Sequence, residues 1–265
     1  MLKKRIIFSL LYCDGYFVQS RNFNIQKVGD VKWLEKNYDF KNISYYIDEL
    51  IVLDISPKKN LDIFLKNLNI ILKFCFIPIS VGGGIDSFSK AKKILRNGAD
   101  KIVINSNLNS KLLNEISTTY GQQSIIASID FKKKIDEYRI FINNSTKELK
   151  INMNKFLKKI NNFPVGEIML NSIDRDGTGN GLDFSILEFL PKKINKSVII
   201  SGGCGNAKHI FEGINKKNID AVSTANLLNF VGDGLKLARD EILEQKVNLP
   251  VWDVKIINKL RNKFK

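Results

Sequence analysis

The sequence predicts an α/β fold, a (β/α)8 TIM barrel built from two fused half-barrels. Two observations predict it. Short β-branched apolar runs alternate with longer amphipathic segments along the chain, and the second half of the chain repeats the first. There are eight such runs, and eight parallel strands are the number that closes this barrel. Because no Pro- or Ser-rich linker interrupts the pattern, we expect one domain over residues 1–265.

The elements follow in order along the chain. The eight expected strands are Lys4–Leu10, Glu49–Ile55, Ile77–Val81, Lys101–Asn105, Ile125–Asp130, Glu167–Asn171, Ser197–Ser201 and Ala221–Thr224. Helical periodicity fills most intervals, for example at Leu61–Phe74, Ser87–Asn97, Ser110–Tyr120 and Lys208–Lys217. After the fifth strand the pattern changes, and Tyr138–Ile142 with Glu148–Ile151 is typical of an inserted β-hairpin.

An internal repeat supports the two half-barrels. VGGGI at 81–85 matches SGGCG at 201–205, and at the same offset GADKIVINSNL at 98–108 matches NIDAVSTANLL at 218–228. RIIFSLL at the first strand matches SIIASID at the fifth, at nearly that offset. We therefore place the half-barrels at roughly 1–120 and 121–250, followed by a basic amphipathic helix over 251–265.

Composition excludes several function classes. Most of the 42 basic residues behind the +15 charge are lysines dispersed along the chain, which indicates compositional drift and no nucleic-acid partner. No apolar run reaches the roughly 18 residues of a membrane span. One histidine and three scattered cysteines predict no metal site and no cofactor, and they fit a reducing cytoplasm.

Two glycine clusters end the third and seventh strands and predict phosphate binding. Glycine lets backbone N–H groups approach an anion closely, and loops after barrel strands form the catalytic face. The loop DRDGTGNG at 174–181, after the sixth strand, suits ribose recognition or a lid. The candidate phosphate-binding residues are Gly82, Gly83, Asn105, Ser106, Asp176, Gly177, Gly202, Gly203, Ala225 and Asn226. The alternative is that these glycines only make tight βα turns.

One carboxylate is placed for acid–base chemistry. Asp130 ends the fifth strand and points inward together with Ser128, by the two-residue period of a strand. Its repeat partner is Leu11, which points inward with Ser9 but transfers no proton. A pair of carboxylates here would let one donate and the other accept a proton, and this chain keeps one of them.

Four charges lie at the strand starts, on the opposite mouth of the barrel. Arg5, Glu49, Lys101 and Glu167 begin the first, second, fourth and sixth strands, two positive and two negative. Such a ring is either a salt-bridge plug that stabilises the barrel or a gate through which a small polar molecule enters from below.

Taken together, these residues resemble the cyclase subunit of imidazole glycerol phosphate synthase, in the half-barrel family of histidine biosynthesis. KRIIFSL, DELIVLDI, VGGGI, GADKIVIN, IDFK, GEIMLNSIDRDGTGNG and SGGCG carry the resemblance over nearly the whole chain. It implies a lyase-class enzyme in which a glutaminase subunit docks at the strand-start face, where Asp100 would contact it. Ammonia would then pass the gate and cross the barrel to a phosphorylated ligand.

Departures from that family bear on activity. The resemblance implies a catalytic aspartate at Leu11, a lysine at Gln19 and a serine at Asn226, while Asp130 is retained. Loss of a general acid–base group typically lowers a rate by about 10²–10⁴-fold. The pattern is similar to a paralogous branch that supplies ammonia to a separate ATP-dependent amidotransferase making acetamidino sugars of surface polysaccharides.

Two other readings stay open. The chain could be a genuine cyclase–lyase in which Asp130 acts with a water or Ser9. It could also be a non-catalytic barrel that binds a phosphorylated metabolite and activates its glutaminase. The scarcity of histidine and cysteine leaves no nucleophile pair for a glutaminase within the chain, so each reading requires a glutaminase partner.

Overall fold

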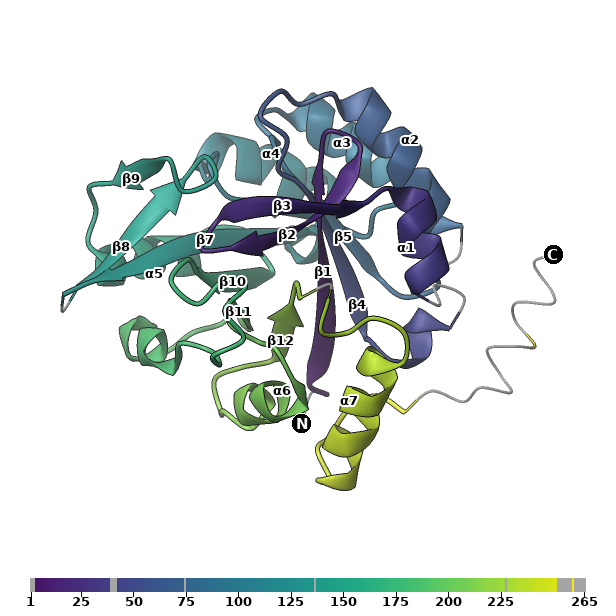
Figure 1. Cartoon of the computed structure of the whole chain (residues 1–265). Helices are drawn as coiled ribbons and strands as arrows, with labels where there is room; N and C mark the ends of the chain where they lie inside the picture. The colour runs from purple at the N-terminus through teal and green to yellow at the C-terminus, as the bar shows by residue number, and fades with distance from the viewer. Residues whose placement is uncertain are drawn as a thin grey trace.

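The computed structural model describes residues 3–38, 42–73, 75–135, 137–226, 228–251 and 259. Eight parallel strands form a closed barrel, with helices outside it (Figure 1). The barrel strands are β1 (Arg5–Cys13), β4 (Glu49–Asp54), β5 (Ile79–Gly82), β6 (Lys101–Ile104), β7 (Ile125–Lys134), β10 (Glu167–Ser172), β11 (Ser197–Ser201) and β12 (Ala221–Thr224).

The order of the strands around the barrel confirms the predicted fold. Neighbours run β10-β11-β12-β1-β4-β5-β6-β7, and β7 pairs in parallel with β10 to close the ring. Asp130 lies opposite Asn171 across that closing pair. Because β1 and β7 are four strands apart in either direction, their inward side chains face each other across the barrel.

Helices cover the outside of the barrel. They are α1 (Val31–Asn37), α2 (Leu61–Leu72), α3 (Phe88–Arg96), α4 (Ser110–Tyr120), α5 (Met153–Asn161), α6 (Ala207–Ile214) and α7 (Gly234–Glu244), with 3-10 turns at η1 (Ile43–Tyr45), η2 (Gln122–Ser124) and η3 (Phe184–Phe189). Asn60, Asn109 and Asn206 cap α2, α4 and α6, each by accepting a backbone N–H bond. The helix predicted at Lys208–Lys217 is α6, which begins one residue earlier, directly after its cap Asn206, and ends three residues earlier.

Two antiparallel excursions leave the barrel at its carboxyl end. β2 (Tyr16–Arg21) and β3 (Asn24–Gly29) form a hairpin after β1 that the sequence did not predict. The predicted hairpin after the fifth strand is present as β8 (Glu137–Ile142) and β9 (Lys147–Leu149), which pair antiparallel. β7 also runs past Asp130 and pairs with β8, so this ribbon extends away from the barrel (Figure 1).

The core has two parts. One lies between strands and helices, and a smaller one fills the inside of the barrel. Within the described ranges no helix is both long and apolar enough to span a bilayer. The helix expected over 251–265 lies almost wholly outside the described residues.

Candidate functional site

A cavity of about 370 Å³ opens at the carboxyl ends of the barrel strands, where TIM-barrel enzymes carry their active sites. Its walls come from both half-barrels and from both excursions. The predicted residues that line it are Leu11, Gly83, Asn105, Ser106, Asp130, Asp176, Gly177, Gly202, Gly203, Ala225 and Asn226. The site residues predicted for the carboxyl-end face thus meet in one cavity, with the exception of Gly82.

Asp130 is the buried acid of this cavity. Its carboxylate accepts hydrogen bonds from Asn105 Nδ2 at 3.2 Å and from Asn171 Nδ2 at 3.0 Å. Burial, together with the nearby charge of Asp176, raises the pKa of Asp130 to about 7, although the Asn171 bond opposes the shift. A carboxyl group with this pKa exchanges a proton readily near neutral pH, as general acid–base chemistry requires.

Leu11 faces the same cavity from the opposite wall. It lies on β1, pairs with Leu53 on β4 and Val18 on β2, and lines the cavity. Among the described residues, the other carboxylates that line the cavity are Asp54, Asp86 and Asp176. The position across the barrel from Asp130 is therefore apolar.

The first glycine cluster begins one residue later than predicted. Gly82 belongs to β5, packed between Leu53 and Val103, and a Cβ there would come within 2.8 Å of both side chains. Gly83 and Gly84 line the cavity and have φ of +111° and +67°. A side chain at Gly83 would collide with the Asp54 carbonyl, so glycine is required. We call Gly83, Gly84, Asn105 and Ser106 the first cradle.

The second cluster is its counterpart in the other half-barrel. Gly202 and Gly203 have φ of +92° and +95°, and their close neighbours are the backbone of Ser172 and of Gly181. Ala225 and Asn226 follow β12, and Thr224 Oγ1 ties that strand end to the Cys204 carbonyl at 2.8 Å. We call Gly202, Gly203, Ala225 and Asn226 the second cradle. Backbone N–H groups in such positions suit an anion.

Asp176 serves a purpose that the sequence did not indicate. Its carboxylate accepts hydrogen bonds from Ser20 Oγ at 2.5 Å and from Phe23 N at 3.1 Å, while its carbonyl accepts one from Asn22 N. Burial raises the pKa of Asp176. The residue therefore fastens the β2–β3 hairpin to the loop after β10, beside the cavity.

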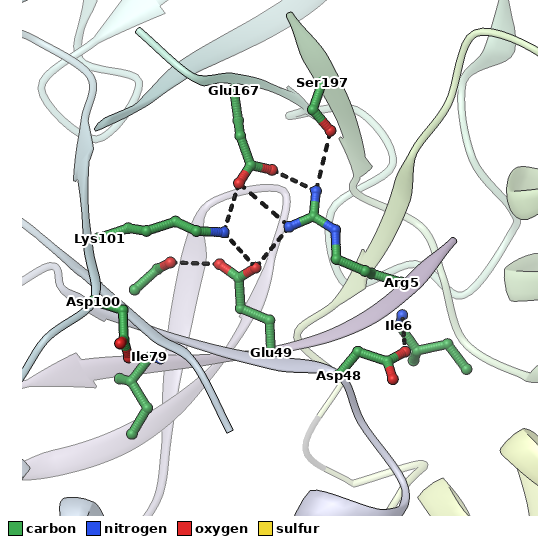
Figure 2. Close-up of polar contacts among 10 residues, drawn as sticks. Arg5, Ile6, Asp48, Glu49, Ile79, Asp100, Lys101, Glu167 and Ser197 are labelled. Carbon is green, nitrogen blue, oxygen red and sulfur yellow. Dashed lines mark hydrogen bonds and ion pairs between the residues drawn. The ribbon is translucent and has the colours of Figure 1, made fainter. Parts of the chain in front are cut away.

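The four predicted gate charges converge at the other end of the barrel (Figure 2). Arg5 lies 2.8 Å from Glu49 and 2.5 Å from Glu167, and Lys101 lies at the same two distances from the same carboxylates. Ser80 Oγ donates to Glu49, and Arg5 donates to Ser197 Oγ. Burial alone would raise the pKa of Glu167, but Arg5 and Lys101 hold it below its ordinary value.

An apolar layer separates this floor from the cavity. One step of two residues along the strands leads from Arg5 to Ile7, from Lys101 to Val103 and from Glu167 to Met169. These side chains are buried together inside the barrel. An ion that entered this layer would lose its hydration, so the layer keeps the charged floor apart from the cavity.

Comparison with known proteins shows which family this chain belongs to. The sequence profile described as histidine biosynthesis protein matches residues 5–232. A chain from Parasynechococcus marenigrum (strain WH8102), provisionally named imidazole glycerol phosphate synthase subunit hisF2, is 45% identical over 95% of each chain. Imidazole glycerol phosphate synthase subunit HisF of Pelodictyon phaeoclathratiforme is 33% identical over 95% of this chain and 100% of its own. HisF of Bacillus cereus (strain Q1) is 34% identical over 93% and 100%. The chain belongs to the HisF-like family of histidine biosynthesis proteins.

Asp100 in this HisF-like chain has a structural partner of its own. Its Oδ2 accepts a hydrogen bond from Ile79 N at 2.8 Å, and Asp48 accepts one from Ile6 N in the same way (Figure 2). Asp220 likewise accepts a hydrogen bond from Val198 N. Asp100 is nevertheless exposed, and it lies at the amino end of β6 beside Lys101. The family resemblance predicts a contact with the glutaminase at this position.

Several cavity residues of the HisF-like chain escaped the sequence analysis. Asn171 binds Asp130, and Lys59 enters the cavity from the loop after β4. The strand period could have found Asn171, because it follows Glu167 and Met169 on the inward face of β10. Lys59 left no comparable signal, since it lies in a lysine-rich loop.

Proposed function

We propose that this HisF-like chain receives ammonia from a glutaminase subunit and supports amidination in the biosynthesis of surface polysaccharides with acetamidino sugars. The observation that carries the proposal is an asymmetry between the two ends of the barrel. The four-charge floor is complete, whereas the cavity has Leu11 across from Asp130. Ammonia entry is thus retained in a barrel that lacks half of an acid–base pair.

The four-charge floor supports the proposed ammonia entry, because burying these charges costs desolvation energy that a purely structural role would not justify. Two carboxylates and two cations meet, and the Glu49 side chain keeps only 1% of its accessible surface. A buried ion pair is a poor means of adding stability, because desolvation offsets much of the attraction. A linked set whose members can exchange partners suits a gate for a molecule that is itself polar.

The residues that line the cavity suit a phosphorylated ligand better than a large apolar one. Its two cradles are glycine turns in opposite halves of the barrel, a backbone arrangement that suits an anion, and Asn105, Ser106 and Asn226 add polar side chains. A ligand with a phosphate at each end would span them.

The identities support a subgroup within the HisF-like family, which we take to be a branch apart from the histidine pathway. Identity to the chain named hisF2 is 45%, against 33% and 34% to the two chains named HisF. In this branch a separate ATP-dependent amidotransferase would consume the ammonia, and the barrel would form little or no imidazole glycerol phosphate.

The alternative function is that of a genuine cyclase subunit of imidazole glycerol phosphate synthase. One observation favours it: Asp130 retains two amide donors, and its pKa of about 7 suits proton transfer. A water or Ser9 would then replace the missing carboxylate; Ser9 Oγ lies 2.7 Å from Ser223 Oγ in the cavity.

Gene deletion tests the proposal against this alternative. Under the proposal, the deletion strain grows without histidine, and mass spectrometry shows surface polysaccharide that has lost its acetamidino groups. Re-expression of the intact chain restores these groups. A strain that requires histidine and keeps its acetamidino groups would refute the proposal in favour of the cyclase.

A further inference from the structure

The charges that line the cavity are uneven. Asp54, Asp86, Asp130 and Asp176 contribute carboxyl groups, and among the described residues that line the cavity Lys59 carries the one cationic side chain. A phosphate ester bears up to two negative charges and binds best through charge-assisted hydrogen bonds. A phosphorylated ligand in this cavity therefore has one side-chain ammonium within its walls to use.

Lys59 lies beside the first cradle. It belongs to the loop between β4 and α2, and its alkyl chain runs past Gly84, where a Cβ would be 2.9 Å from Lys59 Cγ. Its Nζ donates a hydrogen bond to the Asp54 carbonyl at 2.6 Å and lies 3.8 Å from Asp54 Oδ1. That carbonyl is also the close neighbour of Gly83. The Lys59 ammonium and the Gly83 backbone thus both lie next to the Asp54 carbonyl oxygen.

The ammonium is partly desolvated in this position. The Lys59 side chain keeps 28% of its accessible surface. Burial lowers its pKa, although the negative charge of Asp54 opposes this shift. An ammonium offers three donor hydrogens, and the Asp54 carbonyl uses one. An anion that reached Nζ would restore the charge stabilisation that burial removes.

A third loop encloses the same space. The turn between β8 and β9 brings Asn143 and Asn144 to the cavity wall. Asn144 Nδ2 donates to the Ile55 carbonyl at 3.1 Å, and Asn143 N donates to Ser106 Oγ at 3.1 Å. These two bonds hold the turn against both the β4–α2 loop and the first cradle.

We infer that Lys59 binds a phosphoryl group of the ligand at the first cradle, with Nζ moving from the Asp54 carbonyl to a phosphate oxygen. The inference rests on the proposed function, because it takes the ligand to be a phosphate ester. The cation then comes from the β4–α2 loop, whereas Gln19, on β2, lines the cavity without charge.

Inorganic phosphate titrated into the isolated full chain tests the inference, with backbone amide NMR shifts as the readout. We expect Gly83, Gly84 and Ser106 to report the first cradle, and Gly202, Gly203 and Asn226 the second. Lys59→Gln should raise the dissociation constant of phosphate at the first cradle by about tenfold to a hundredfold. The dissociation constant at the second cradle should change by less than about twofold. Lys59→Arg should recover part of the loss, because it keeps a charge.

Lys58→Gln is the matched control, since Lys58 is the neighbouring lysine of the same loop and does not line the cavity. It should leave both constants unchanged. Equal constants for Lys59→Gln and the wild type, or a wild-type first cradle that phosphate does not shift, would overturn the inference. A lower melting temperature with unchanged affinity would also overturn it, by making Lys59 structural. None of these readouts involves glutaminase or turnover, so such a failure leaves the proposal on ammonia delivery standing.

Discussion

Asp130 shows how one residue is prepared by its surroundings. It is 8% exposed, has two amide donors and sits four strands from Leu11 in either direction around the barrel. Burial, more than any neighbouring charge, raises its pKa to about 7. The fold therefore holds an acid that is partly protonated at neutral pH, and such an acid destabilises the folded state once it ionises.

This shift predicts a pH dependence of stability. Unfolded Asp130 ionises near pH 3.8 and folded Asp130 near 7, so the free energy of unfolding should fall between these values and level off above them. Asp130→Asn lacks this loss. Its free energy of unfolding should gain on the wild type across that window, with a slope of up to about 1.4 kcal/mol per pH unit. Urea unfolding at several pH values measures the difference, and a difference independent of pH would contradict the assigned pKa.

Leu11 carries the second prediction at this scale. Leu11→Asp places a carboxylate across from Asp130, and glutamine-independent turnover of the histidine-pathway intermediate with ammonia should rise by about 10²-fold or more. Leu11→Asn is the control, because it has nearly the same size and polarity without a titratable proton. Equal rates for the two variants would show that the missing carboxylate is not what limits the barrel.

At the scale of elements, the Asp176 carboxylate is one anchor of the β2–β3 hairpin, beside its pairing with β1 and the Asn22 Nδ2 bonds to the Ile173 and Asp174 carbonyls. Ser20, Asn22 and Phe23 all bond to Asp176. Asp176→Ala should therefore raise the hydrogen-exchange rates of residues 16–29 by about tenfold or more, since the side-chain bonds to a charged group are lost. Asp174→Ala is the control: Asp174 binds Lys133 N on the β7–β8 ribbon, so exchange should rise there and not in the hairpin. Unchanged hydrogen-exchange rates of the hairpin in Asp176→Ala would show that the Asp176 side chain does not anchor it.

The floor of the barrel joins β1, β4, β6 and β10 through side chains. Glu49→Gln keeps size but leaves Arg5 and Lys101 short of one buried anion, so the free energy of unfolding should fall by about 3 kcal/mol. Asp62→Asn breaks an exposed pair with Lys93 and should change it by less than about 1 kcal/mol. Denaturant unfolding compares the two, and equal effects would mean that the floor is not an electrostatically coupled unit.

At the scale of the whole molecule, the sequence was most informative where periodicity and repetition act together. The strand period predicted that Arg5 lies on the same side of β1 as Ser9 and Leu11, and the internal repeat matched Gly202 with Gly82. The barrel and the convergence of the four strand-start charges could therefore be predicted. What escaped prediction depends on contacts between distant segments. Asp176 bonds to Ser20, 156 residues earlier in the chain, and Lys59 packs against Gly84 from a different loop. The sequence also did not decide whether the glycines of the second cradle line a site or only make tight turns. Local pattern carries no information about such pairs.

One measurement tests the central claim most directly: purify the chain with a co-expressed glutaminase, supply glutamine and the histidine-pathway intermediate, and follow ammonia and imidazole glycerol phosphate together. We predict that the glutaminase co-elutes and hydrolyses glutamine. Free ammonia should then accumulate in near-equal amount to glutamate, while imidazole glycerol phosphate forms at a rate at least about 10²-fold below that of glutamine hydrolysis. Stoichiometric formation of imidazole glycerol phosphate from glutamine would contradict the account and identify a genuine cyclase.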